Sequence, residues 1–227
     1  MARLFGQKWL ESRAGAGVLL NYLLTITTLA LGALLFAGCA GPVRVTTIDD
    51  TERRIISVAQ WGGTPADESR ARRHTINRIT LHHAGVAFPR GKDPIAYMQN
   101  LQRWSRDTRK WLDLPYHYVI DLDGNIYEGR NIKFAGDTNT EYDPAGHALI
   151  EVVGNFEEVE PNEAQLAAVV ETMAMLAAKY RVPVEKIEGH KDHSRQTVCP
   201  GKNLYRYLEN GYFRDRVRER VKAAAAS

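Results

Sequence analysis

Residues 76–84, INRITLHHA, alternate apolar and polar side chains in a way that predicts a half-buried β-strand. Ile79 and Leu81 fall on one face of this strand, whereas Thr80 and His82 fall on the other. One face is therefore expected to pack in the core, and the opposite face carries an imidazole at the end of the strand.

A helix is predicted after this strand, over residues 93–111. Apolar residues recur there at helical intervals, and Asp93 before Pro94 is typical of a helix start. We expect the helix to bury this stripe. Its inward positions are Ile95, Met98, Leu101 and Trp104.

A hairpin, a further strand and two more helices follow. Residues 115–130 alternate Tyr, Val and Ile around an Asp-Gly-Asn turn, which predicts a β-hairpin. Residues 147–157 form another apolar run, and residues 162–180 and 212–226 have helical periodicity, although the final AAAAS is expected to fray. Alternating helices and strands predict a single α/β domain with a central mixed β-sheet flanked by helices. The inward stripes of the two helices are Leu166, Val169, Met173, Leu176 and Tyr180 in the first, and Phe213, Val217 and Val221 in the second.

The N-terminal end has the layout of an export signal. Residues 1–38 begin with basic side chains and continue into an apolar stretch, and Ala37-Gly38-Cys39 resembles a bacterial lipoprotein cleavage site. This resemblance implies cleavage before Cys39 and lipidation of its thiol. The alternative is an uncleaved membrane anchor, because about 20 apolar residues can span a bilayer.

Either alternative leaves a folded domain at a membrane surface outside the cytoplasm. We expect residues 39–54 to be a tether and residues 55–227 to be the domain. Ala40 is not the aspartate associated with inner-membrane retention, so the expected location is the periplasmic face of the outer membrane. The protein is thus expected to be attached to the membrane through lipidated Cys39.

Charge and length exclude some classes of function. The chain has 30 Lys and Arg against 27 Asp and Glu, a net charge of +3 over 227 residues, which gives no electrostatic argument for binding nucleic acid. The part that follows the leader is long enough for one domain with a hydrophobic core. A monomer is the default expectation.

The chain has two cysteines, and Cys199 lies in the polar segment GHKDHSRQTVCPG, residues 189–201. If Cys39 carries lipid, Cys199 has no disulfide partner within the chain. Three interpretations remain open: a buried inert thiol, a nucleophile with His190 as its base, or a metal ligand.

Two histidines, together with Cys199, form a possible set of metal ligands. His82 ends a predicted strand, and His190 and Cys199 flank one polar loop. Two imidazoles and one thiolate supply three ligands for Zn²⁺ and leave a fourth position open, as in catalytic zinc sites. His193 is a competing ligand.

Four ordered segments resemble one family of enzymes. The sequences ITLHHAG, LPYHYVIDLDGNIYEGR, VVGNFE and GHKDHSRQTVCPGKNL are similar to those of type 2 N-acetylmuramoyl-L-alanine amidases, which include phage lysozyme-type amidases and peptidoglycan recognition proteins. The resemblance covers about residues 55–210. It implies a mixed sheet flanked by helices, with zinc at the floor of a groove for peptidoglycan.

The resemblance also implies site residues. The zinc ligands fall on His82, His190 and Cys199, and the family's active-site tyrosine falls on Tyr116. The residue two before the cysteine is Thr197, which we take as a second polar group at the reaction centre.

Two further positions bear on the groove. Asp137 stands where many relatives have a groove histidine, and His147 is interpreted as a strand-start residue with a solvated ring.

The implied activity is hydrolysis of the amide bond between N-acetylmuramic acid and L-alanine in peptidoglycan or its fragments. Two alternatives stay open at this point. The domain can bind peptidoglycan (glycan strand and stem peptide) without cutting it, or it can be a cell-wall peptidase that depends on Cys199.

Overall fold

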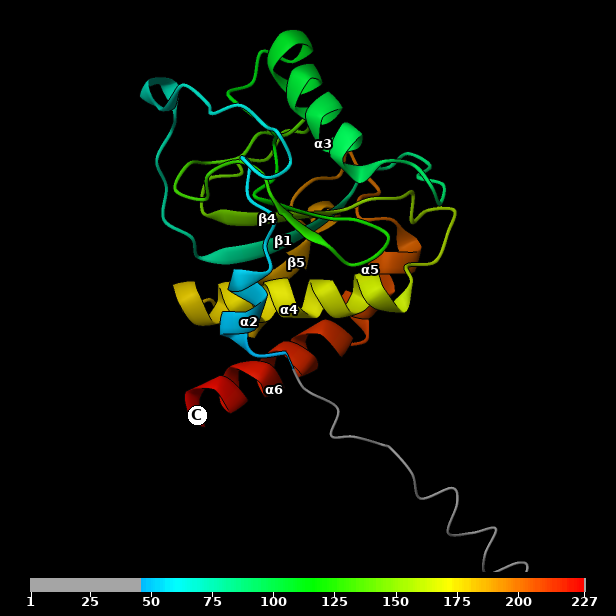
Figure 1. Ribbon diagram of the computed structural model, residues 1–227. Helices are drawn as coiled ribbons and strands as arrows, with labels where there is room; N and C mark the ends of the chain where they lie inside the picture. Colours follow the sequence, from blue (N-terminus) through cyan, green and yellow to red (C-terminus); the bar gives the residue numbers. More distant parts are fainter. Residues whose placement is uncertain (1–45, 227) are drawn as a thin grey trace, which may run out of the picture. The chain divides into compact units, whose positions relative to one another are not determined.

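The computed structural model describes residues 46–226. Figure 1 shows the arrangement of its elements. No helix within residues 46–226 is long and apolar enough to cross a membrane. The helices and strands are α2 (Ile48–Arg53), η1 (Glu68–Arg70), β1 (Arg78–His83), α3 (Pro94–Arg103), η2 (Trp104–Thr108), β2 (Tyr118–Ile120), β3 (Ile126–Glu128), β4 (His147–Val152), α4 (Glu163–Tyr180), η3 (Val184–Lys186), β5 (Ile187–Gly189), η4 (His190–Asp192), α5 (Lys202–Glu209) and α6 (Tyr212–Ala226).

The five strands form one mixed sheet in the order β3-β2-β4-β1-β5. β1 lies between β4 and β5 and pairs in parallel with both, β2 pairs in parallel with β4, and β2 and β3 form the antiparallel hairpin. The mixed sheet flanked by helices confirms the predicted fold class. The hairpin turn is held by Asp121, whose carboxylate accepts hydrogen bonds from the backbone N–H groups of Asp123 and Asn125 at 2.9 Å.

The two faces of the sheet have different roles. Ile79 and Leu81 of β1 belong to the main hydrophobic core, which α4 covers. Thr80 and His82 point to the other face, as the alternation predicts. Figure 1 shows α2, α4 and α6 on one side of the sheet and α3 on the other. The α3 side is the one that carries polar side chains.

Helix α4 is buried on more than its predicted stripe. Asn162 caps it and forms a capping box with Gln165, which fixes where the helix begins. Val170 and Ala174, which lie outside the predicted stripe, are also buried, because α2 and α6 pack against the side of α4 that faces away from the sheet. The sequence periodicity alone does not show this third layer.

Helix α3 begins at Pro94, with Asp93 as its N-cap, as predicted. Met98 is buried, but Ile95 and Trp104 are 40% and 41% exposed, so the expectation that these two side chains face inward is wrong. Helix α3 ends at Arg103, before the predicted end at residue 111. Trp104 begins the π-helical turn η2, which changes the direction of the side chains at the edge of a cavity.

Both ends of the unit differ from expectation. Helix α2 lies inside the segment predicted as a tether, because Thr47 forms a capping box and Ile48 packs against the main core. At the other end, α6 continues to Ala226, so the Ala-rich end is helical rather than frayed. Arg220 joins the two ends by donating a 2.7 Å hydrogen bond to the carbonyl of Thr46. The predicted leader and Cys39 lie outside the described residues.

Candidate functional site

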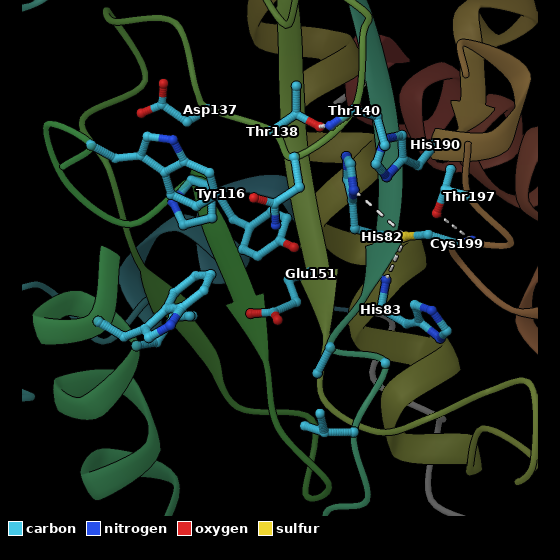
Figure 2. Close-up of a pocket in the computed structure, with 18 of the residues that line it drawn as sticks. His82, His83, Tyr116, Asp137, Thr138, Thr140, Glu151, His190, Thr197 and Cys199 are labelled. Atoms are coloured by element: carbon cyan, nitrogen blue, oxygen red, sulfur yellow. Dashed lines mark hydrogen bonds between the residues drawn. The ribbon is translucent and has the colours of Figure 1, made fainter. Parts of the chain in front are cut away.

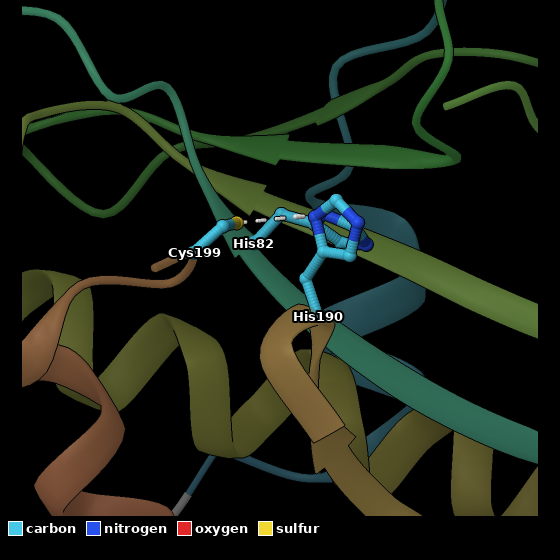
Figure 3. A group of neighbouring side chains, drawn as sticks. All are labelled: His82, His190 and Cys199. Carbon is cyan, nitrogen blue, oxygen red and sulfur yellow. Dashed lines mark hydrogen bonds between the residues drawn. The ribbon is translucent and has the colours of Figure 1, made fainter. Parts of the chain in front are cut away.

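The three predicted metal ligands converge at one end of the central strands. His82 is near the end of β1, His190 follows β5 directly, and Cys199 precedes α5. Their candidate ligand atoms all lie within 4.8 Å of one another, and Cys199 Sγ is 3.6 Å from His82 Nδ1. Figure 3 shows the three side chains pointing toward one another. Because β1 and β5 are parallel neighbours, their carboxyl ends meet at this edge of the sheet.

Burial keeps this group in a state that fits a divalent cation. His82 and His190 are 2% and 8% exposed, and burial lowers the pKa of His82 well below its usual value and that of His190 to about 4. Both imidazoles are therefore neutral at pH 7, the form that binds metal. Burial raises the pKa of the Cys199 thiol to about 12, so its thiolate needs a nearby cation. Two nitrogens and one sulfur suit Zn²⁺ with an open position.

Backbone hydrogen bonds hold the thiol in place. The N–H of His83 donates to Cys199 Sγ at 3.3 Å, and the N–H of Cys199 donates to the Thr197 hydroxyl at 3.0 Å. The carbonyl of Cys199 accepts from the N–H of Lys191 at 2.8 Å, which ties the cysteine to the segment of His190. Thr197 thus shapes the cysteine's loop as well as lining the cavity described next.

A cavity of about 500 Å³ opens above the three ligands, on the α3 side of the sheet. Figure 2 shows part of its lining. The lining combines aromatic rings with hydroxyl and amide groups, which suits a ligand with both apolar and polar parts. The aromatic rings are those of Tyr97, Trp104, Trp111 and Tyr116, and the hydroxyl and amide groups are those of Thr138, Asn139, Thr140, Gln196 and Thr197.

Tyr116 lies beside the metal ligands, as the sequence predicted. Its ring centroid is 5.2 Å from that of His82, and it lines the cavity. Burial raises the pKa of Tyr116 well above its usual value, so the hydroxyl keeps its proton at neutral pH and can donate a hydrogen bond. His117 points the opposite way, where its ring bonds the carbonyl of Phe134 and the N–H of Leu149.

The sequence reasoning missed Glu151. It pairs with His82 in the β1–β4 register, lines the cavity and is 1% exposed. Tyr97 Oη donates to its Oε1 at 2.9 Å, while its Oε2 is buried without a hydrogen-bond partner. Burial raises the pKa of Glu151 to about 8. The signal was available, because this carboxylate interrupts an apolar strand at a position that faces His82.

His147 and His193 pack against each other outside the group of three metal-ligand candidates. Their ring centroids are 4.6 Å apart, and His193 Nε2 is 3.4 Å from a carboxylate oxygen of Glu188. Neither residue is in the group of converging ligand atoms, which contains His190 as predicted. The expected solvated ring of His147 is wrong, because the ring is buried and its Nδ1 is 2.8 Å from the Thr80 hydroxyl.

Asp137 lines the cavity and forms an ion pair with the buried guanidinium of Arg130. Arg130 also donates to the carbonyls of Asp113, Leu114 and Ala135. The carboxylate is therefore fixed at the rim of the cavity by a structural arginine.

Two curated proteins are similar in sequence to about two thirds of this chain. Peptidoglycan-recognition protein SD of Drosophila melanogaster is 33% identical over 163 residues, which cover 68% of this chain and 84% of that protein. An N-acetylmuramoyl-L-alanine amidase of Homo sapiens is 30% identical over 155 residues, 66% of this chain but only 27% of that longer protein.

A solved structure and a family model agree with these relatives. The crystal structure of Drosophila peptidoglycan recognition protein SD superposes with a TM-score of 0.62 and 28% identity, and covers 68% of this chain and 92% of that one. The family model described as N-acetylmuramoyl-L-alanine amidase matches residues 72–202, a stretch that contains all three metal-ligand candidates and Tyr116. Site, sequence and fold together place this chain in the N-acetylmuramoyl-L-alanine amidase family.

Proposed function

We propose that this protein is a zinc-dependent amidase that cleaves the bond between N-acetylmuramic acid and L-alanine in peptidoglycan or its fragments. The observation that carries this proposal is the convergence of His82, His190 and Cys199 at the floor of a cavity that also contains Tyr116 and Glu151. The name of the human relative supports the reaction. A similar structure, 28% identical, is a complex of recognition proteins with tracheal cytotoxin, which supports a muropeptide ligand.

His82, His190 and Cys199 would hold the zinc ion. When bound there, zinc supplies Lewis acidity, which lowers the pKa of water from 15.7 toward about 7 and polarises a carbonyl group. The rest of the catalytic work falls on the chain's own side chains. Tyr116 keeps its phenol proton and lies beside His82, so it is placed to donate a hydrogen bond to the oxygen that becomes negative during amide hydrolysis.

Glu151 is the best-placed proton acceptor in the cavity. Its Oε1 is fixed by Tyr97, and its Oε2 has no protein partner although it is buried. Burial raises the pKa of Glu151 to about 8 in the metal-free chain, and a nearby divalent cation would favour its ionised form. In that form the carboxylate oxygen can take a proton from water and pass it to the leaving amine. Thr197 lines the same cavity, and since its oxygen already accepts from Cys199, its hydroxyl proton is the part left to contact substrate.

The metal-ligand role of Cys199 is favoured over that of a nucleophile. A nucleophilic cysteine needs its thiolate, and the burial that raises the pKa of this thiol to about 12 works against it. The hydrogen-bond contact of Cys199 Sγ with an imidazole, at 3.6 Å, is also with Nδ1 of His82 and not with the expected base, His190. We also favour catalysis over binding without cleavage, because a cavity that only binds peptidoglycan does not need a complete zinc site with an open position.

Replacement of Cys199 tests the proposed function. The purified protein should hold about one zinc per chain and release a new L-alanine amino terminus from muropeptides. Cys199→Ser should lose most of its zinc and all measurable turnover. Cys39→Ser is the matched control, because it removes the only other thiol and should keep both properties.

Three results would contradict the proposal. Turnover that survives complete zinc removal would exclude the metal-dependent reaction. Zinc-loaded protein that binds muropeptides and leaves them intact would point to a recognition protein. A Cys199→Ser variant with normal zinc content would mean that the cysteine is not a ligand.

A further inference from the structure

A loop on the far side of the cavity reaches across to the metal-binding segment. We call residues 137–143 the bracing loop. Thr140 Oγ1 lies 2.7 Å from His190 Nε2, and within residues 46–226 this is the only hydrogen bond of that ring nitrogen. Figure 2 shows Thr138, Thr140 and His190 at the same end of the cavity. The loop therefore touches one of the three metal-ligand candidates directly.

The bracing loop holds the same segment at two more points. Glu141 accepts hydrogen bonds from the Ser194 hydroxyl at 2.6 Å and from the N–H of Arg195 at 3.3 Å. The ring of Tyr142 lies against that of His190, with centroids 5.0 Å apart. Three successive residues of the loop thus contact residues 190–195.

Both ends of the bracing loop are anchored. Asp137 pairs with buried Arg130, and Asp143 accepts from Arg72 Nη1 at 3.0 Å and from the N–H of Ala145 at 2.9 Å. Such a loop is held by interactions that do not depend on His190. It can therefore impose an orientation on the imidazole rather than follow it.

The contact with Thr140 decides which nitrogen of His190 can bind metal. A neutral imidazole carries one proton, and a metal ligand must present its unprotonated nitrogen. If Nε2–H donates to the Thr140 hydroxyl, then Nδ1 is the unprotonated nitrogen that is left to bind metal. If the hydroxyl donated instead, Nδ1 would be protonated and could not coordinate.

We propose that Thr140 is a positioning residue that selects Nδ1 of His190 as the zinc ligand and holds its ring in place. In this arrangement the Thr140 proton is directed to Thr138 Oγ1, which is 2.9 Å away. The inference rests on the proposed zinc site and adds a specific outer partner to it. Groups that hydrogen-bond a metal-ligating histidine commonly contribute about 10- to 100-fold to metal affinity.

The test measures zinc affinity of the full chain by competition with a chelating dye, and does not depend on activity. Thr140→Val keeps the shape of the side chain and removes the hydroxyl, so it should bind zinc about 10- to 100-fold more weakly than the wild type. Thr140→Ser keeps the acceptor and should stay within about threefold. Thr51→Val is the matched control, because it removes a threonine hydroxyl that donates to the Thr47 carbonyl in α2 and does not line the cavity.

The outcomes separate this inference from the proposed function. A wild-type protein that binds no zinc would sink both. If the wild type binds zinc and Thr140→Val binds it equally tightly, only the role of the Thr140 hydroxyl is overturned. The same holds if Thr140→Val and Thr140→Ser weaken zinc binding equally. If the Val variant does not fold, ¹⁵N NMR of wild-type His190 decides instead: a ring bound to zinc through Nε2 contradicts the proposal, and one bound through Nδ1 with a protonated Nε2 supports it.

Discussion

Glu151 shows how a single position can turn a structural strand into part of a reaction site. Its neighbours in β4, Ile150 and Val152, belong to the core on the α4 side, whereas Glu151 faces the cavity beside His82. Burying a carboxyl group lowers the stability of the fold unless hydrogen bonds compensate for the lost contact with water. Here one oxygen has Tyr97 as its partner and the other has none.

Glu151→Gln should lower kcat by about 10²- to 10⁴-fold, because an amide has similar shape but cannot accept a proton in the reaction. Zinc content should remain unchanged, since Glu151 is not among the converging ligand atoms. Steady-state kinetics on a defined muropeptide, with zinc measured on the same sample, provides the check.

Tyr97→Phe is a matched control for this variant. It removes the hydrogen bond to Glu151 and leaves the carboxyl group in place, so its loss of kcat should be much smaller. Near wild-type kcat in Glu151→Gln would show that another group accepts the proton.

At the residue scale, the resemblance to a family identified His82, His190, Cys199 and Tyr116, and the structure brings all four together. Spacing alone could not do so, because 108 positions separate the two histidines and only the pairing of β1 with β5 joins them. Thr140 was out of reach for another reason: a loop threonine has no periodic pattern that reports its partner.

A short connection joins Cys199 to α5 and ends at Gly201. Gly201 has a φ of +84° and caps α5, and a Cβ built on it would lie 2.5 Å from the backbone carbon of Phe156. Backbone cannot move aside as a flexible side chain can. The position therefore requires glycine both for its conformation and for its close approach.

Gly201→Ala should destabilise the protein by about 1–3 kcal/mol more than Gly91→Ala, because it adds a backbone clash to the same unfavourable φ. Gly91 is the matched position, with a φ of +86° and open space around its Cβ. Urea unfolding of both variants measures the difference. Equal destabilisation would show that the loop at Gly201 relaxes at no cost.

At the element scale, long periodic segments were predictable and short ones were not. The strand at 78–83, the hairpin and helix α4 all appear where alternation or helical spacing placed them. Strand β5 has only three residues, and its burial depends on pairing with β1, so no local pattern marks it. Helix α2 was missed because its stability comes from packing on α4 rather than from its own composition.

The whole molecule should be sensitive to acid. All seven histidines have a lowered pKa in the folded protein, with burial as the largest cause in each. Unfolded histidines titrate near 6.5, so below that pH the unfolded chain binds more protons than the folded one. The free energy of unfolding must therefore fall as the pH falls from about 6.5 toward 4. Glu151 has the opposite sign, because its raised pKa makes the folded state the better proton binder between about 4.5 and 8.

We expect the free energy of unfolding of the zinc-free protein, and with it the urea midpoint, to fall continuously between pH 7 and pH 5. The free energy should fall by up to about 1.4 kcal/mol per pH unit for each proton taken up. Circular dichroism at several pH values measures it, and the zinc-free form keeps metal release out of the result. A midpoint that stays constant over this range would show that the histidines are not held neutral by the fold.

The hydrogen bond between Arg220 and Thr46 brings the first described residue to the C-terminal helix, on the α4 side of the sheet and behind the cavity. An attachment at either end of this unit, whether to a bead, a fusion partner or a bilayer, leaves the mouth of the cavity facing outward. A large, rigid substrate such as a cell-wall network could then approach an immobilised molecule without meeting its support.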